Sequence, residues 1–147
     1  MEINDLQIGK AGEYLVCADL ILNGHVAFPS EQGLPYDVVF DHDGIMLKVQ
    51  VKTTRSPRNL QRKNPVQGYV FNIKRRGKGN KSRTSDKTCD IFALVALDSK
   101  VIGYLPNKDV RETMNFRSEQ FRGKYRVESG GTYLETLTLD RCLCVLK

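Results

Sequence analysis

The sequence predicts an α/β fold in which a mixed β-sheet is flanked by helices. Three observations predict it: an amphipathic helical pattern near the N-terminus, two strands joined by a glycine-containing turn, and a continuous apolar run at residues 90–97. The chain has 147 residues, of which 40% are hydrophobic and 27% are charged. This length and composition suit a single domain of residues 1–147 with a buried core.

The helix is expected over residues 8–23. Apolar side chains recur there at spacings of three and four residues, which places them on one face of a helix. They are Ile8, Ala11, Leu15, Ala18 and Leu22. Asn23 and Gly24 follow, and both tolerate the left-handed backbone conformation that commonly ends a helix.

Three strands are expected next, at residues 25–28, 36–40 and 45–54. Residues 41–44 are Asp, His, Asp and Gly, a composition typical of turns, so the second and third strands are expected to form a hairpin. Side chains alternate along the third strand, with one set facing the core and the other including Gln50 and Lys52. The expected core-facing set is Ile45, Leu47, Val49 and Val51.

The second half of the chain predicts further strands. Residues 68–74 form one, and the run at 90–97 is apolar enough to be buried on both faces. Residues 101–105 form the next strand, a short helix is expected around 108–113, and residues 132–146 contain strand-like segments. Two basic excursions leave this sheet: a loop at 55–67, and a segment at 74–88 that is expected to be mobile because it is rich in Gly, Ser, Lys and Arg.

The net charge of +6 is concentrated in one segment. Residues 52–87 hold twelve Lys and Arg and a single acid, Asp86, so they carry +11 while the rest of the chain carries −5. A block of one sign on a nearly balanced chain predicts a docking surface for a polyanion, most often a nucleic acid. A solvated charged loop is the simpler alternative. Binding to a membrane surface is disfavoured because the block lacks an amphipathic helical pattern.

Composition also bounds the cellular location. No apolar run approaches the roughly 18 residues of a membrane span, and the first residues lack the features of a secretory signal. We therefore expect a cytoplasmic protein with no membrane partner. Free thiols are expected in that compartment, with the last two on the same side of a strand; the cysteines are Cys17, Cys89, Cys142 and Cys144. A zinc site is disfavoured because no C-x-x-C motif is present and the chain has only two histidines.

Four side chains are expected to converge. Glu13 lies on the helix, Asp37 on the second strand, and Gln50 and Lys52 on one face of the third. The hairpin can bring Asp37 beside Gln50. Oxygen atoms of Asp37, Gln50 and Glu13 suit Mg²⁺, and Lys52 can hold or deprotonate a water or neutralise charge on a pentavalent phosphorus. Taken singly, each residue has a simpler interpretation as a turn, helix-surface or strand-surface residue.

These stretches resemble the PD-(D/E)XK nuclease superfamily. The matching segments are Gly12-Glu13, Pro35-Tyr36-Asp37-Val38-Val39 and Val49-Gln50-Val51-Lys52-Thr53, followed by the buried strands at 90–95 and 103–106. The resemblance covers residues 8–106, the expected catalytic core, and leaves 107–147 as an addition of unknown role. It implies a mixed sheet flanked by helices, and Mg²⁺-dependent cleavage of nucleic-acid phosphodiesters.

The resemblance also implies a role for each residue of the site. Asp37 corresponds to the metal-binding aspartate, Lys52 to the catalytic lysine, and Glu13 to the helix glutamate of the resolvase-like branch. Gln50 occupies the D/E position and departs from the pattern, because an amide oxygen carries no charge. Two carboxylates in place of three favour one tightly bound ion over two.

The Gln-x-Lys-Thr variant after Tyr-Asp-Val-Val most resembles the small homing endonucleases of this superfamily that group I introns encode. That resemblance implies a site-specific endonuclease for double-stranded DNA that acts as a homo-oligomer, either a dimer or a tetramer. Two alternatives stay open: a structure-selective nuclease that resolves four-way junctions, and a non-catalytic module that binds nucleic acid. The residues expected to contact DNA are Arg55, Arg58, Arg62, Lys63, Lys74, Arg75, Arg76, Lys78, Lys81 and Arg83.

Overall fold

The computed structural model describes residues 1–61, 66–73, 88–123 and 131–146. A central sheet contains, in spatial order, β1 (Ala27–Pro29), β2 (Val38–His42), β3 (Ile45–Thr54), β6 (Ile91–Ala96) and β7 (Val101–Pro106). A smaller sheet contains β4 (Arg58–Asn59), β5 (Gln67–Asn72) and β8 (Thr113–Arg117). The helical elements are α1 (Asp5–Leu22), α2 (Leu139–Val145) and the 3₁₀ turns η1 (Asn107–Asp109), η2 (Glu119–Phe121) and η3 (Leu134–Thr136).

The central sheet is mixed, as predicted. β2 and β3 are antiparallel and are joined through Asp43 and Gly44, whose φ values of 52° and 84° suit a tight hairpin turn. β3 runs parallel to β6, with Lys52 opposite Leu94, and β6 runs antiparallel to β7. All six residues of β6 are buried, which confirms the strand predicted to be covered on both faces.

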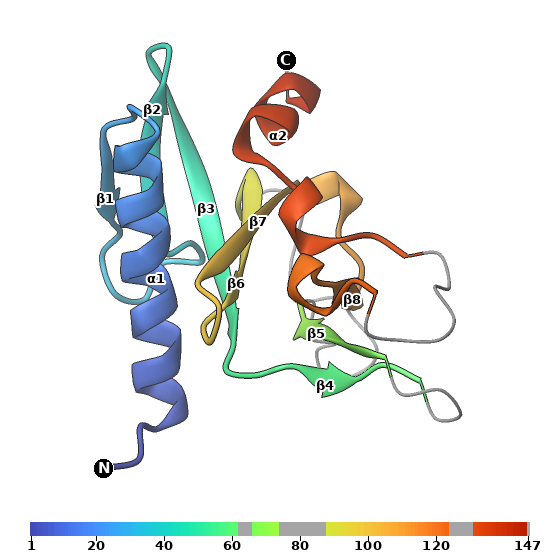
Figure 1. Cartoon of the computed structure of the whole chain (residues 1–147). Helices are drawn as coiled ribbons and strands as arrows, with labels where there is room; N and C mark the ends of the chain where they lie inside the picture. Colours follow the sequence, from blue (N-terminus) through green and yellow to red (C-terminus); the bar gives the residue numbers. More distant parts are fainter. Residues whose placement is uncertain (62–65, 74–87, 124–130, 147) are drawn as a thin grey trace, which may run out of the picture.

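The two faces of this sheet are covered differently (Figure 1). On one face, Val16 and Leu20 of α1 are fully buried against the sheet, and Leu139 of α2 joins the same apolar cluster. On the other face, the smaller sheet contributes a second cluster that includes Tyr69 and Phe116. In the described part of the chain, no helix is long and apolar enough to cross a membrane.

A buried tyrosine joins the smaller sheet to the central one. Tyr69 of β5 is fully buried, and its hydroxyl donates to Asp98 at 2.9 Å in the turn between β6 and β7. The same hydroxyl lies 3.2 Å from Ser99 Oγ and accepts the Gln120 Nε2–H of η2 at 2.5 Å. These bonds tie β5 to the turn between β6 and β7 and to η2, so the two sheets are held in a fixed relation.

The predicted elements after β7 are wrong in type. The short helix expected around 108–113 is one 3₁₀ turn, and β8 follows it to pair with β5. The strand-like segments expected at 132–146 are η3 and α2. Thr138 caps α2 by accepting the Arg141 N–H, and the buried Leu139, Cys142 and Leu143 have helical spacing. Consequently Cys142 is buried and Cys144 is exposed, so they do not share a side as expected.

Smaller differences concern the hairpin and the basic loop. Ile45 was expected to face the core but is 64% exposed, because β6 pairs with β3 only from Val49 onward and the hairpin tip extends beyond it. The loop expected at 55–67 contains the two-residue strand β4. Residues 75–88 were expected to be mobile. Of these, the described part of the chain includes only Thr88.

Two contacts fix α1 on the central sheet. Gly12 lies so close to β3 that an added Cβ would stand 1.9 Å from Thr53 Oγ1, a distance that no real side chain adopts. Further along the helix, the Tyr104 hydroxyl of β7 donates to the Asp19 carboxylate at 2.5 Å. The helix backbone therefore rests directly on the strand that carries Gln50 and Lys52.

We predict that Gly12→Ala destabilises the fold by about 1–3 kcal/mol, because the methyl group must displace either α1 or Thr53. Gly9→Ala in the same helix is the matched control, since a Cβ there meets nothing within 4 Å. It should stabilise the protein by about 1 kcal/mol through helix propensity alone. Urea denaturation of the two variants measures both changes, and equal effects of the same sign would contradict the close contact.

Candidate active site

Asp37 is held against β3 by backbone hydrogen bonds just before β2 begins. Its N–H donates to the Val49 carbonyl at 2.8 Å, and its carboxylate Oδ2 accepts the Val51 N–H at 2.7 Å. The Asp37 carbonyl accepts the Ser30 N–H at 2.9 Å, which ties the preceding loop to the same point. These bonds span Gln50 on β3, so the hairpin brings Asp37 next to the position that the sequence predicted.

Gln50 and Lys52 leave the same face of β3, opposite Phe92 and Leu94 of β6. The Gln50 amide oxygen is buried, and no hydrogen-bond donor of the described residues reaches it. A buried amide oxygen without a donor has lost its hydration without replacement, which is unfavourable unless something else binds it. A bound cation would satisfy this oxygen.

Glu13 approaches from α1, one residue after the close contact at Gly12. Its carboxylate accepts from Lys10 Nζ at 2.7 Å. An open hollow of about 380 Å³ lies beside Glu13 and Asp37 and is also lined by Tyr36 and Glu31. Both carboxylates therefore border one solvent-filled space large enough to admit an ion and part of a substrate.

Charge interactions link the predicted residues. Burial raises the pKa of the Asp37 carboxyl above its usual range, and the neighbouring Glu13 carboxylate raises it further. The Val51 N–H, Lys52 and Lys10 act in the opposite direction and lower this pKa. Asp37 is thus within electrostatic range of both Glu13 and Lys52, and its bonds to Val49 and Val51 place it beside Gln50 on β3. Gln50 and Lys52 are not among the described residues that line the hollow.

The donor set fits a hard divalent cation. Two carboxylates and an amide oxygen are the ligand types that Mg²⁺ takes, with water completing its coordination. Within residues 1–61, 66–73, 88–123 and 131–146, no group of three His, Cys, Asp or Glu side chains is arranged to hold a metal. The third ligand of the proposed set is the Gln50 amide, which is not one of these four residue types.

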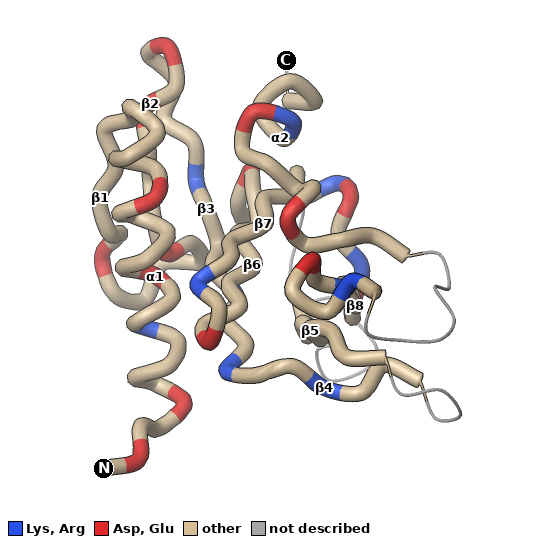
Figure 2. The backbone as a smooth tube through the Cα atoms, in the orientation of Figure 1, with Lys and Arg blue, Asp and Glu red and all other residues tan. Residues whose placement is uncertain are grey.

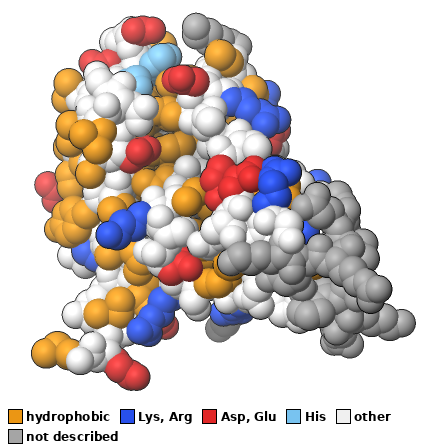
Figure 3. All heavy atoms as spheres, in the orientation of Figure 1, with side chains coloured by type: hydrophobic (Ala, Val, Ile, Leu, Met, Phe, Trp, Pro, Cys, Tyr) orange, Lys and Arg blue, Asp and Glu red, His pale blue; other side chains and the backbone are white. Residues whose placement is uncertain are grey.

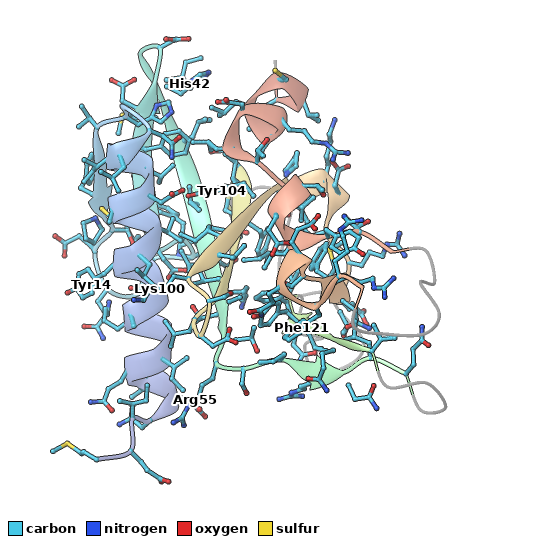
Figure 4. The ribbon with its side chains drawn as sticks, viewed as in Figure 1. Tyr14, His42, Arg55, Lys100, Tyr104 and Phe121 are labelled. Atoms are coloured by element: carbon cyan, nitrogen blue, oxygen red, sulfur yellow. The ribbon has the colours of Figure 1, made fainter. Side chains whose placement is uncertain are left out.

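The structure describes two of the ten basic residues expected to contact DNA. Arg55 and Arg58 are exposed, at the bend that follows β3 and in β4 (Figures 2 and 4). Arg55 stands three residues after Lys52 along the chain. The other eight lie outside the described residues: Arg62, Lys63, Lys74, Arg75, Arg76, Lys78, Lys81 and Arg83.

Some residues around the site were missed by the sequence reasoning. Lys10 pairs with Glu13, and its spacing of three residues on a helix was the available signal. Lys48 Nζ lies 5.3 Å from the ring centroid of Tyr36, a cation–π contact between the loop before β2 and β3. Glu31 belongs to an irregular loop, where no periodic pattern indicates which side chains face the hollow.

Cys89 lies beside the site, where its thiol has a hydrogen bond with the Gln50 backbone and is within electrostatic range of Asp37. Burial raises the pKa of the Cys89 thiol to about 11 and that of Cys142 to about 12. Both thiols are therefore protonated at neutral pH and are poor nucleophiles or metal ligands.

We predict that Asp37→Asn stabilises the protein when no divalent cation is bound. An amide keeps the acceptor for the Val51 N–H but removes the buried charge, and the gain at neutral pH should be on the order of 1 kcal/mol after solvent screening. In the wild type, burial of the ionised Asp37 carboxylate lowers the free energy of unfolding. Because the pKa of Asp37 is higher in the folded than in the unfolded protein, this loss is absent below the unfolded-state pKa and is complete once the pH has risen through the folded-state pKa. The gain measured by thermal unfolding should therefore shrink at acidic pH.

Asp43→Asn is the control for this prediction, because the Asp43 side chain is 89% exposed at the hairpin tip. It should change the free energy of unfolding by less than about 0.5 kcal/mol at either pH. A lower free energy of unfolding in Asp37→Asn at neutral pH would contradict the interpretation that the Asp37 carboxylate is an unfavourable buried charge in the cation-free protein.

Comparison with known proteins identifies the family and a similar fold. The family model for the PD-(D/E)XK endonuclease matches residues 3–128. No curated protein sequence matches the chain. Among solved structures, the fold is similar to that of a bacterial homing endonuclease, I-Ssp6803I, with a TM-score of 0.61 and 17% identity over 83% of this chain and 84% of that one. The predicted fold and family are confirmed: the chain belongs to the PD-(D/E)XK endonuclease family.

Proposed function

We propose that this protein is a Mg²⁺-dependent endonuclease that cleaves double-stranded DNA at specific sites, as an intron-encoded homing enzyme inside the cell. The observation that carries the proposal is the position of Asp37, bonded to β3 on both sides of Gln50 and within electrostatic range of Lys52 and Glu13. The family consists of nucleases, which generally depend on divalent metal ions.

In this proposal Asp37, Gln50 and Glu13 hold the cation. The ion, when bound, lowers the pKa of a coordinated water and neutralises charge on the phosphate. Gln50 contributes an oxygen without a charge, so the two carboxylates balance the charge of one divalent ion. Lys10 has to release Glu13 or share it, because the two are paired at 2.7 Å.

Lys52 is the proposed catalytic lysine. Its ammonium group leaves β3 on the same face as Gln50 and can stabilise the charge that develops on the phosphorus oxygens, or hold the attacking water. Lys52 also lowers the pKa of Asp37, which favours the ionised form needed to bind a cation.

Arg55 and Arg58 are proposed to contact phosphates beside the cut. Both are exposed and follow the catalytic strand directly, so a DNA backbone that passes over Lys52 meets them next. The eight basic residues outside the described part of the chain are proposed to extend this contact. Such binding releases counterions and therefore weakens steeply as salt concentration rises.

A double-strand break requires two active sites, so we propose that the protein acts as a homo-oligomer. Figure 3 shows apolar side chains along the edge formed by α1 and β1. Tyr14 and Ile21 lie seven residues apart on α1 and are 61% and 52% exposed, and Phe28 of the short strand β1 is 45% exposed. Burying this surface between copies is favourable, and β1 is an edge strand open to pairing.

We predict that purified protein cleaves duplex DNA containing its target in the presence of Mg²⁺, and that Lys52→Ala lowers the rate about 10²–10³-fold. Single-turnover cleavage followed on gels measures this effect. Lys108→Ala is the control, because Lys108 is exposed on η1, which follows β7, and β7 is two strands away from β3 in the central sheet. Its loss should leave the rate within about twofold.

Three outcomes separate the functions. Faster cleavage of a four-way junction than of any linear duplex would indicate that the protein resolves junctions and is not a homing endonuclease. Salt-dependent binding without turnover would indicate a non-catalytic module. Full activity of Lys52→Ala would contradict the proposed role of the lysine.

We predict that the wild-type protein sediments as a dimer or tetramer and that Ile21→Glu shifts it toward the monomer, because a buried carboxylate at an apolar interface is strongly unfavourable. Val145→Glu on α2, where the side chain is 42% exposed, is the control and should leave the oligomer intact. Analytical ultracentrifugation measures both. A wild-type monomer at all concentrations would rule out this interface.

A further inference from the structure

The outer face of the smaller sheet carries side chains that the core does not use, and of these only Arg58 belongs to the proposed phosphate contact. Tyr69 and Phe71 of β5 pair with Phe116 and Met114 of β8 and face the core. Because side chains alternate along a strand, the residues between them point to the opposite face. We call this the outer face of the small sheet; it consists of Arg58, Val70, Asn72, Thr113 and Asn115. Arg117, at its end, is buried and lies over the Tyr133 ring.

This face is polar, exposed and free of acids. Asn72, Thr113, Asn115 and Arg58 are exposed, and Val70 is half-buried between them. Thr113 Oγ1 donates to Asn72 Oδ1 at 3.4 Å, which confirms that these two side chains are cross-strand neighbours on one face. The described strand residues of β4, β5 and β8 include no Asp or Glu. A surface with two amides and an arginine but no carboxylate complements a polyanion that also presents hydrogen-bonding groups.

The residue types match the base edges in the major groove of DNA. An asparagine amide can pair with N6 and N7 of adenine, an arginine with O6 and N7 of guanine, and an apolar group can contact the methyl group of thymine. The groove, about 12 Å wide, admits a two-stranded β-ribbon, and β5 and β8 form such an antiparallel pair with only the two residues of β4 beside it. Asparagine amides can also donate to phosphate oxygens, but such contacts carry no sequence information, so a change in sequence preference distinguishes the two roles.

The sheet is also fixed close to the proposed catalytic lysine. β4 begins at Arg58, six residues after Lys52, so the two Cα atoms are at most about 21 Å apart. Tyr69 secures the sheet through Asp98 and Gln120, with bonds of 2.9 and 2.5 Å, which prevents it from swinging on the linker. Since base pairs rise about 3.4 Å along the axis, bases read by this face lie within roughly one helical turn of the cut.

We propose that the outer face of the small sheet reads base edges in the major groove, with Asn72 and Asn115 as specificity-determining residues. This inference rests on the proposed function, in that the polyanion is the DNA substrate. It goes beyond that function because it assigns sequence discrimination to uncharged residues of β5 and β8 rather than to the basic block.

Binding selection from a randomised duplex library tests the proposal, carried out in EDTA so that cleavage plays no part. The wild-type protein should enrich a motif. Asn115→Ala and Asn72→Ala should each lose the preference at one or two positions of that motif and keep it elsewhere. Their ratio of specific to non-specific affinity should fall about 10-fold, while affinity for unrelated DNA stays within about twofold.

Two further variants sharpen the test. Asn115→Asp keeps the size of the side chain but adds a charge that DNA repels, so it should weaken binding to all sequences as well. Arg141→Ala on α2, which packs on the other face of the central sheet, should enrich the wild-type motif unchanged. Thermal unfolding checks that all variants are folded, which is expected for exposed positions.

The outcomes distinguish this inference from the proposed function. If both alanine variants enrich the wild-type motif, or lose affinity equally for every sequence, the assignment of base reading to this face is wrong even when the protein cleaves DNA. If the protein never cleaves but the motif changes as predicted, the base-reading face stands and the nuclease proposal fails.

Discussion

The close contact between α1 and β3 is the constraint on which the site depends. With only hydrogen at Gly12, the helix backbone reaches Thr53, and the next residue, Glu13, arrives at the hollow beside Asp37. The bond from Tyr104 to Asp19 holds a second point of the helix on β7. Two attachments about two helical turns apart fix both the position and the direction of α1. A side chain at Gly12 would have to displace either Thr53 or α1, which carries Glu13.

The proposed metal site is costly to the fold. Asp37 is held as a partly buried carboxylate beside a second acid, and the Gln50 amide oxygen is buried without a donor among the described residues. The Val51 N–H and two lysines offset only part of this cost. The buried Asp37 charge and the unpaired Gln50 oxygen both lower the stability of the cation-free protein. A bound cation would remove both costs, so the same two features raise the affinity for a cation.

The core and the site were predictable because they rest on short-range patterns. Helical spacing marked α1, alternation marked β3, and a hairpin turn at Asp43 and Gly44 was enough to bring Asp37 to the level of Gln50. β8 was missed because its pairing with β5 links residues some forty positions apart, and α2 was missed because Cys142 and Cys144 mimic an alternating strand. The Tyr69 network depends on three separate elements, which no local pattern reveals.

The parallel pairing of β3 with β6 has a consequence for where the chain can lengthen. Between Thr54, where β3 ends, and Ile91, where β6 begins, the chain leaves the central sheet and forms β4 and β5. The entropy of closing such a loop rises by only about 0.6 kcal/mol when its length doubles. Insertions can therefore lengthen this excursion at little entropic cost to the β3–β6 ladder, as long as Tyr69 and Phe71 of β5 stay in the cluster that they form with Phe92 and Leu94 of β6. Under the proposed function, such insertions change the surface offered to DNA while Gln50 and Lys52 stay on β3.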